Sequence, residues 1–109
     1  MLIKRIRTKT RPSINIEWNW VDETNEIVIQ MDTLEQALLD NGIIHAVFST
    51  VSEDELTVTK ELQFTSIENY VSYEKQHSEL QYSNGDFINS VQYMINNGIA
   101  HTASYTFKP

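Results

Sequence analysis

Residues 42–80, GIIHAVFSTVSEDELTVTKELQFTSIENYVSYEKQHSEL, decide the fold of this chain. Two segments in the first half, 43–51 and 55–64, are rich in β-branched and aromatic residues, which favour strands. Polar residues from Ser52 to Asp54 separate the two segments, and a linker of that length is typical of a hairpin. We therefore expect the two segments to pair as antiparallel strands.

Two helices and a last strand are predicted after the hairpin. Thr65 and Glu68 form a capping box that opens a helix running to about His77. A second helix should follow the break at 84–86, because the apolar residues beyond it recur at helical spacing. Residues 99–107 alternate apolar or aromatic with small and polar side chains, a pattern typical of a strand.

The N-terminal half permits more than one interpretation. Residues 2–20 indicate one long strand or two consecutive ones, with a kink at Pro12, which lacks a backbone donor. The residues that follow, 21–41, carry an apolar face at helical spacing, and a single helix is the preferred interpretation. The alternative is a strand over EIVIQM followed by a shorter helix from Thr33, so the first helix begins at residue 22 or at residue 33.

In chain order these segments predict β, α, β, β, α, a second C-terminal helix and a final β. This order is typical of an α+β protein of ferredoxin-like βαββαβ organisation, with an extra helix before the last strand. We expect one domain over 1–109, built on a four-stranded antiparallel sheet with helices on one face. Both alternating sets of side chains in 43–51 include apolar residues, so the second face should also be covered.

Residues 42–80 resemble the strand, hairpin, strand and helix core of dimeric α+β-barrel proteins, such as the antibiotic-biosynthesis monooxygenase-like families. In that fold two ferredoxin-like sheets pack face to face, so the resemblance implies a homodimer formed through the sheet face. Residues 9–18, KTRPSINIEW, are also similar to small uncharacterised proteins of marine microbes and their phages. Members of the superfamily include enzymes and binding modules, and the resemblance therefore implies no particular function.

Charge and composition exclude some classes of protein. The chain has no cysteine, which excludes disulfides, thiolate nucleophiles and cysteine-bound zinc. No apolar run approaches the roughly 20 residues of a membrane span, and no signal-peptide pattern follows the basic start. We expect a soluble, cytoplasmic protein with no bound metal, no cofactor and no membrane contact. A net charge of −7 makes nucleic acid an improbable partner, because phosphates are repelled at long range.

Two tryptophans lie in 13–20, SINIEWNW, where apolar side chains occupy every second position. If this stretch is a strand, Trp18 and Trp20 share a face with Ile14 and Ile16. Such a stripe usually fills a core or an interface, which is the preferred interpretation. The alternative is a ligand-binding surface that includes both tryptophans.

The first strand is unusually basic. Arg5, Arg7, Lys9 and Arg11 fall on one side of it, about 6.6 Å apart at two residues per repeat. Four cations in a row repel one another unless anionic groups lie beside them. Pairing with acids of the same chain or of a second copy is the preferred interpretation. The alternative is an anion-binding site for a phosphate-bearing ligand or a single-stranded nucleic acid.

The histidines give the only candidates for catalysis. His45 and His101 lie on predicted strands, and His101 shares a face with Tyr105. In a cleft between sheet and helices they could act as a general acid and its orienting group. The simpler explanation is that strand histidines bond to neighbouring backbone or hydroxyl groups. His77 lies near a helix end, where it suits the helix dipole.

The sequence as a whole favours a homodimeric, non-enzymatic binding or structural module, which binds a second copy and potentially a small molecule. The main alternative is a cofactor-independent, monooxygenase-like enzyme that acts on a small aromatic or apolar compound in the cleft, with contacts from His45, His101, Tyr105 and Trp18. Anion or single-stranded nucleic-acid binding by the basic strand ranks third.

Overall fold

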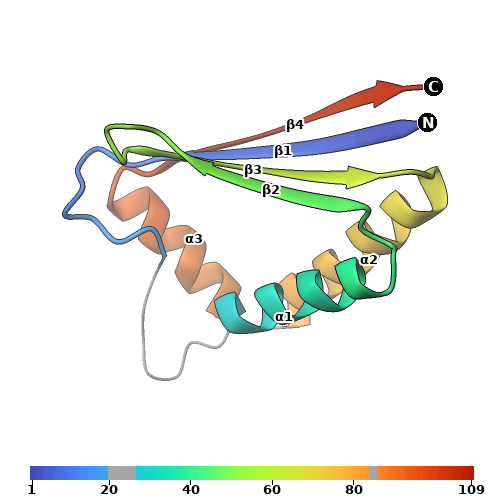
Figure 1. Ribbon diagram of the computed structural model, residues 1–109. Helices are drawn as coiled ribbons and strands as arrows, with labels where there is room; N and C mark the ends of the chain where they lie inside the picture. The colour runs from blue at the N-terminus through green and yellow to red at the C-terminus, as the bar shows by residue number, and fades with distance from the viewer. Residues whose placement is uncertain (20–26, 84–85) are drawn as a thin grey trace.

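The computed structural model describes residues 1–19, 27–83 and 86–109. Within these residues the chain forms four strands and three helices (Figure 1). In chain order they are β1 (Leu2–Thr10), α1 (Ile27–Asp40), β2 (Ala46–Val51), β3 (Thr57–Phe64), α2 (Ile67–Ser83), α3 (Asp86–Asn96) and β4 (Ala100–Lys108). The predicted order of elements, including the extra helix before the last strand, is confirmed.

The strands form one antiparallel sheet in the order β2-β3-β1-β4. The strand that begins the chain is therefore central, with β3 on one side and β4 on the other. Its first residue, Leu2, pairs with Lys108, so the two ends of the described chain lie side by side (Figure 1). All three helices lie on one side of the sheet, and the predicted hairpin of β2 and β3 is confirmed.

The first helix begins earlier than the shorter alternative requires. Residues from Ile27 to Met31 are helical, so the interpretation of EIVIQM as a strand is wrong from Ile27 onward. Residues 20–26, including Trp20, lie outside the described residues. The helix ends at Asp40, where Gly42 adopts a left-handed conformation (φ 82°) that suits a residue without Cβ.

The second helix differs from the prediction at both ends. Its cap is Ser66 rather than Thr65, because the Ser66 hydroxyl accepts a 3.1 Å hydrogen bond from the Asn69 amide. The helix continues past His77 to Ser83. Tyr73 and His77 lie one turn apart and are both buried, so the inward face of the helix extends well beyond its first turns.

The third helix stops where its glycine predicts. Gly98 has a φ of 68°, and its amide donates to the carbonyl of Ile95 at 3.3 Å. The amide of Ile99 reaches back to the carbonyl of Met94 at 2.9 Å, which completes a Schellman-type ending. The chain then enters β4, and the predicted last strand is confirmed.

The predicted strand over SINIEWNW is wrong, because β1 ends at Thr10. The amide of Arg11 donates to the carbonyl of Leu56 at 2.8 Å, and the next residue, Pro12, has no N–H to extend the ladder. A turn follows, in which the carbonyl of Ser13 accepts from the amide of Ile16 at 3.2 Å. The expected apolar stripe does not form within the described residues, and Ile14 is 58% exposed.

The core lies between the helices and the sheet face that they cover, which we call the inner face. Its central residue is Phe64, which is fully buried and packs against Tyr70 and Tyr73 of α2 at ring-centroid distances of 5.5 and 5.3 Å. The other buried members of the cluster are Ile3, Leu38, Ile44, Leu62 and Tyr73. This cluster lies at the end of the inner face where β1 begins and β3 ends.

The opposite face of the sheet, which we call the outer face, is mostly uncharged. One row of threonines crosses all four strands and consists of Thr50, Thr59, Thr8 and Thr102. Apolar residues on this face are Leu2, Ile6, Ala46, Ala100 and Phe48, the last of which is 53% exposed. The expectation that β2 carries apolar groups on both faces is therefore met, because Val47 and Val51 turn to the inner face.

Within the described part of the chain, we find no helix with the length and apolar character needed to cross a membrane.

Candidate functional site

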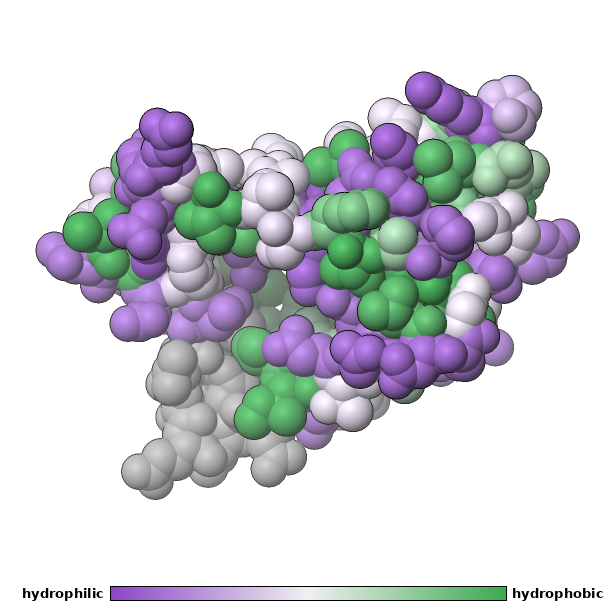
Figure 2. All heavy atoms as spheres, in the orientation of Figure 1, coloured by the Kyte–Doolittle hydropathy of each residue, from purple (hydrophilic) through white to green (hydrophobic). Residues whose placement is uncertain are grey.

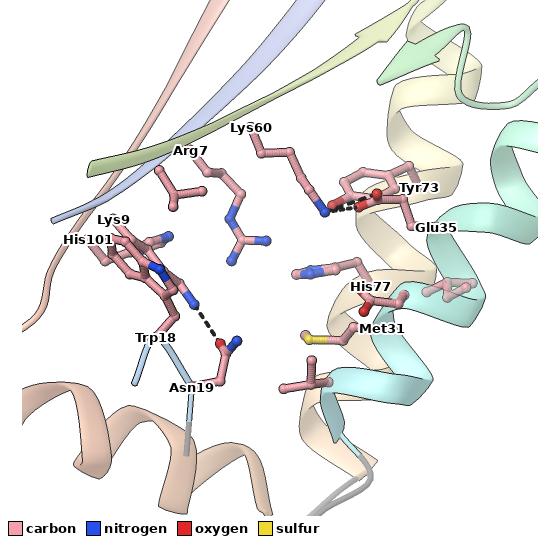
Figure 3. Close-up of a pocket in the computed structure, with 14 residues that line it drawn as sticks. Arg7, Lys9, Trp18, Asn19, Met31, Glu35, Lys60, Tyr73, His77 and His101 are labelled. Atoms are coloured by element: carbon pink, nitrogen blue, oxygen red, sulfur yellow. Dashed lines mark hydrogen bonds and ion pairs between the residues drawn. The ribbon is translucent and has the colours of Figure 1, made fainter. Parts of the chain in front are cut away.

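A cavity of about 330 Å³ lies between the inner face of the sheet and helices α1 and α2 (Figure 3). Figure 2 shows the molecule hollowed between the sheet and these helices. The segment that follows β1 brings Trp18 and Asn19 to one side of the cavity. The lining residues are Arg7, Lys9, Trp18, Asn19, Val28, Met31, Asp32, Leu34, Glu35, Val58, Lys60, Tyr73, His77 and His101.

Along β1 the side chains of the inner face change from apolar to basic, and the basic part lines the cavity. Ile3 lies opposite Phe64 in the apolar core. Two residues further on, Arg5 lies opposite Leu62, and Arg7 then lies opposite Lys60. Because alternate residues of a strand share one face, Arg5, Arg7 and Lys9 of the predicted basic stripe point toward the helices. These three cations therefore lie inside the molecule. The prediction is wrong for Arg11, which lies beyond the end of β1 at Thr10.

Arg5 is bonded within the protein. Its Nη1 donates to the hydroxyl of Tyr73 at 2.7 Å, and its Nε lies 3.2 Å from the hydroxyl of Tyr105 and 3.1 Å from Glu74 Oε1. Burial alone lowers the pKa of Arg5, but the surrounding Tyr73, Tyr105 and Glu74 outweigh it and raise the pKa above its usual value. Arg5 is therefore a structural cation with its charge compensated.

Arg11 is also bonded within the protein. Its Nε donates to the carbonyl of Glu55 at 3.0 Å, and its Nη1 donates to the carbonyl of Ile16 at 2.8 Å. The guanidinium lies 4.2 Å from the centre of the Trp18 ring, within the range of a cation–π contact. Arg11 thus fixes the segment that carries Trp18 beside the cavity.

Arg7 and Lys9 are the cations left for the cavity. Among the residues that the structure describes, the side chain of Arg7 has no hydrogen bond or ion pair, and it points into the cavity (Figure 3). Lys9 Nζ donates to Asn19 Oδ1 at 3.0 Å. Burial, followed by repulsion from neighbouring cations, lowers the pKa of both side chains below the usual values. The cavity therefore contains positive charge that no described acid compensates directly.

His77 is the functional candidate that the sequence did not single out. It is 6% exposed, stacks on Tyr73 at 5.4 Å, and points toward Arg7 across the cavity (Figure 3). Burial, followed by Arg7 and Arg5, lowers the pKa of His77 to about 4, so its imidazole is neutral at pH 7. Its spacing of four residues from Tyr73 was the available signal, because it places both on one helix face.

Carboxylates of α1 line the opposite wall. Both oxygens of Glu35 lie 3.0 Å from Lys60 Nζ, so this acid is already paired. Asp32 also lines the cavity and is exposed. In the described ranges no group of three or more His, Cys, Asp or Glu side chains could hold a metal ion.

The structure places the remaining candidates in different surroundings. His101 lines the cavity as an exposed residue of β4, and burial, followed by Arg7, Lys9 and Arg5, lowers its pKa. Tyr105 shares the inner face, but it donates to Glu74 at 3.1 Å and does not line the cavity. His45 is exposed just before β2 and also lies outside the lining. Of the three predicted catalytic residues, the structure brings only His101 to the cavity.

No family model matches the chain, and no curated protein matches it. Two dimeric ferredoxin-like proteins from uncultured marine organisms match in structure. One has 9% identity and a TM-score of 0.57 over 96% of this chain and 92% of its own. The other has 13% identity and a TM-score of 0.53 over 99% and 90%. The fold is ferredoxin-like.

A NIPSNAP family protein from Agrobacterium tumefaciens also matches, at 10% identity and a TM-score of 0.52 over 100% of this chain and 94% of its own. At such low identities these likenesses show the fold alone, and they confirm the predicted resemblance to dimeric ferredoxin-like proteins. A putative antibiotic biosynthesis monooxygenase from Bordetella bronchiseptica aligns at 11% identity with a TM-score of 0.42.

Proposed function

We propose that this protein is a homodimeric, non-enzymatic binding module that holds a small, largely apolar molecule in the cavity between sheet and helices. The supporting observation is the cavity itself. Its size is typical of the smaller ligand sites, and Val28, Met31, Leu34 and Val58 line it together with a few converging polar groups. Such a mixture provides apolar contact area for affinity and polar groups for orientation.

Binding can be tested with N-phenyl-1-naphthylamine, an uncharged dye that fluoresces when it enters an apolar site. Met31→Trp fills the cavity and should abolish the fluorescence increase, because Met31 lines it. Val71→Trp is the matched control, because Val71 is 55% exposed on α2 and does not line the cavity. Equal binding to both variants, or a wild type that binds neither this dye nor another small aromatic compound, would contradict the proposal.

The proposed dimer forms through the outer face. Support comes from the uncharged threonine row, from the exposed Phe48, and from the two ferredoxin-like neighbours that are described as dimeric. Two such faces can pack closely because few charges lose their water. Packing two copies in this way would leave the helices, and with them the cavity of each copy, on the outside.

Light scattering at micromolar concentration tests the dimer. Phe48→Glu places a charge on the outer face and should convert a dimer to a monomer. Val51→Glu is the matched control, because Val51 lies on the same strand but turns to the inner face, where it is 59% exposed. A monomeric wild type, or equal effects of both changes, argues against the outer face as the interface.

The monooxygenase-like alternative has one observation in its favour. His77 provides a neutral imidazole beside Arg7, and a proton acceptor next to a cation suits a substrate that loses a proton before it reacts. Protein-dependent oxygen consumption with small phenolic compounds, lost in His77→Gln, would favour this alternative. Nucleic-acid binding along β1 has less support, because Arg5 and Arg11 are held by internal contacts.

A further inference from the structure

We propose that the molecule in the cavity is a monoanion, an apolar compound with one carboxylate or similar acid group, whose acid group binds Arg7 and Lys9. Its apolar body then lies against Met31, Leu34 and Val58. This inference rests on the proposed function and specifies the ligand class for the same cavity.

The contrast between Arg5 and Arg7 is the first line of support. Both lie on the inner face of β1, two residues apart. Around Arg5 the chain provides Glu74 and two tyrosine hydroxyls, which compensate its charge. Around Arg7 no described residue accepts a hydrogen bond, although the side chain is largely removed from water. Burying an unpaired charge is costly, and a bound anion would offset that cost.

The geometry of the two cations suits one acid group. The planar guanidinium of Arg7 can donate two parallel hydrogen bonds to a carboxylate. Lys9 follows on the same face, about 6.6 Å further along the strand, and its bond to Asn19 holds it beside the cavity. Figure 3 shows both side chains directed at the same space. A ligand acid group between them would contact both cations.

The charge and size of the cavity favour a single negative charge. Asp32 and Glu35 line the wall formed by α1 and would repel a second anionic group there. The rest of that wall is apolar, with Met31 and Leu34. A volume of about 330 Å³ lies at the low end for ligand sites and suits a compound of one or two rings or a short chain. Polyphosphates fit neither the charge nor the size.

The test compares two ligands that differ only in charge, 2-naphthoate and the neutral 2-naphthamide, by calorimetric titration. The wild type should bind 2-naphthoate at least about tenfold more tightly than 2-naphthamide, because hydrogen bonds from Arg7 and Lys9 to a charged acid group are stronger than those to a neutral amide. Arg7→Gln should reduce this preference, because it should weaken the binding of 2-naphthoate much more than the binding of 2-naphthamide. Lys4→Gln is the matched control, because Lys4 has the same type of charge on the outer face of the same strand.

Further variants separate the anion site from effects on folding. Arg7→Lys retains the charge but loses the paired donors, so it should keep part of the preference for 2-naphthoate, and Lys9→Gln should lose part of it. Circular dichroism checks that each variant is folded. Equal binding of both compounds by the wild type, or an unchanged preference in Arg7→Gln, would overturn the inference.

The result with the neutral dye distinguishes the two proposals. If N-phenyl-1-naphthylamine binds in the cavity but 2-naphthoate does not, the monoanion is wrong and the binding function stands. If the dye, 2-naphthoate and 2-naphthamide all fail to bind, both proposals fall.

Discussion

The guanidinium of Arg5 donates a 2.7 Å hydrogen bond to the hydroxyl of Tyr73, which lies 68 residues later in the chain. The next residue on the same strand face, Arg7, has no such partner among the described residues. Two arginines with the same backbone environment therefore have opposite roles. Arg5 connects β1 to α2, whereas the side chain of Arg7 lines the cavity, and in our proposal it costs stability until an anion binds.

Replacing each arginine by glutamine should expose this difference. Arg5→Gln removes the donor to the Tyr73 hydroxyl and the cation beside Glu74, and we expect the free energy of unfolding to fall by about 2–3 kcal/mol. Arg7→Gln should change it by less than about 0.5 kcal/mol or raise it. Urea unfolding at one fixed protein concentration measures both values. Similar losses in the two variants would show that Arg7 has a partner after all.

Stability should fall in mild acid because of His77. The pKa of His77 is about 4 in the folded protein against 6.5 unfolded, so between these pH values the unfolded chain binds more protons. His77 therefore lowers the free energy of unfolding as pH falls from 6.5 toward 4, by roughly 3 kcal/mol at most, and has no such effect above 6.5. His77→Phe should flatten this part of the curve.

Urea unfolding at several pH values tests this dependence. His45→Phe is the matched control, because His45 is exposed and should leave the curve unchanged. An identical pH profile for wild type and His77→Phe would contradict the burial of a neutral imidazole.

Arg11 should control the mobility of the segment that follows β1. Arg11→Gln removes the hydrogen bond to the carbonyl of Ile16 and the contact with Trp18, and we expect a loss of about 1 kcal/mol. In a Trp20→Phe background, which leaves a single tryptophan, the emission of Trp18 should shift to longer wavelength and be quenched more readily by acrylamide. Arg11→Lys keeps the positive charge but lacks the planar guanidinium that bonds to two carbonyls and lies over the Trp18 ring. Unchanged Trp18 emission in both variants would exclude this role.

Replacing either Gly42 or Gly98 by alanine should reduce the stability of the protein by a similar amount. Gly98 and Gly42 have φ angles of 68° and 82°, a left-handed region in which a Cβ costs about 1 kcal/mol. A Cβ at Gly98 would lie 3.6 Å from Pro12, an ordinary contact, and one at Gly42 would meet nothing within 4 Å. Similar losses of about 1 kcal/mol in thermal unfolding are therefore expected. A much larger loss at Gly98 would indicate that the neighbouring Pro12 segment is also displaced.

The parts of the fold that could be predicted from sequence are those set by local patterns. The hairpin of β2 and β3 and the helix before Gly98 depend on periodicity and turn residues within a short window. The segment 11–19 could not be predicted in this way. Its alternating residues imitate a strand, whereas its actual path depends on contacts of Arg11 with Glu55 and Ile16.

The candidate site, like the fold, could be predicted from the sequence only where it depends on a local pattern. Periodicity placed Arg5, Arg7 and Lys9 on one strand face, and the structure agrees. Which cation has a partner depends on side chains that α2 brings from far along the chain, and no local pattern records that. His77 was assigned to a helix end because the helix was expected to stop there. It lines the cavity because it lies one turn after Tyr73 on the inward face of α2, which continues to Ser83.

The central position of β1 also determines how the molecule can form during synthesis. This strand is synthesised before the other three, yet its partners are β3, in the middle of the described chain, and β4, near residue 108. Until β4 is made, one edge of β1 has no native neighbour. Closing the sheet therefore requires contacts between distant parts of the chain, and such topologies fold slowly. Formation of the binding cavity should be a late event, completed after translation of Lys108.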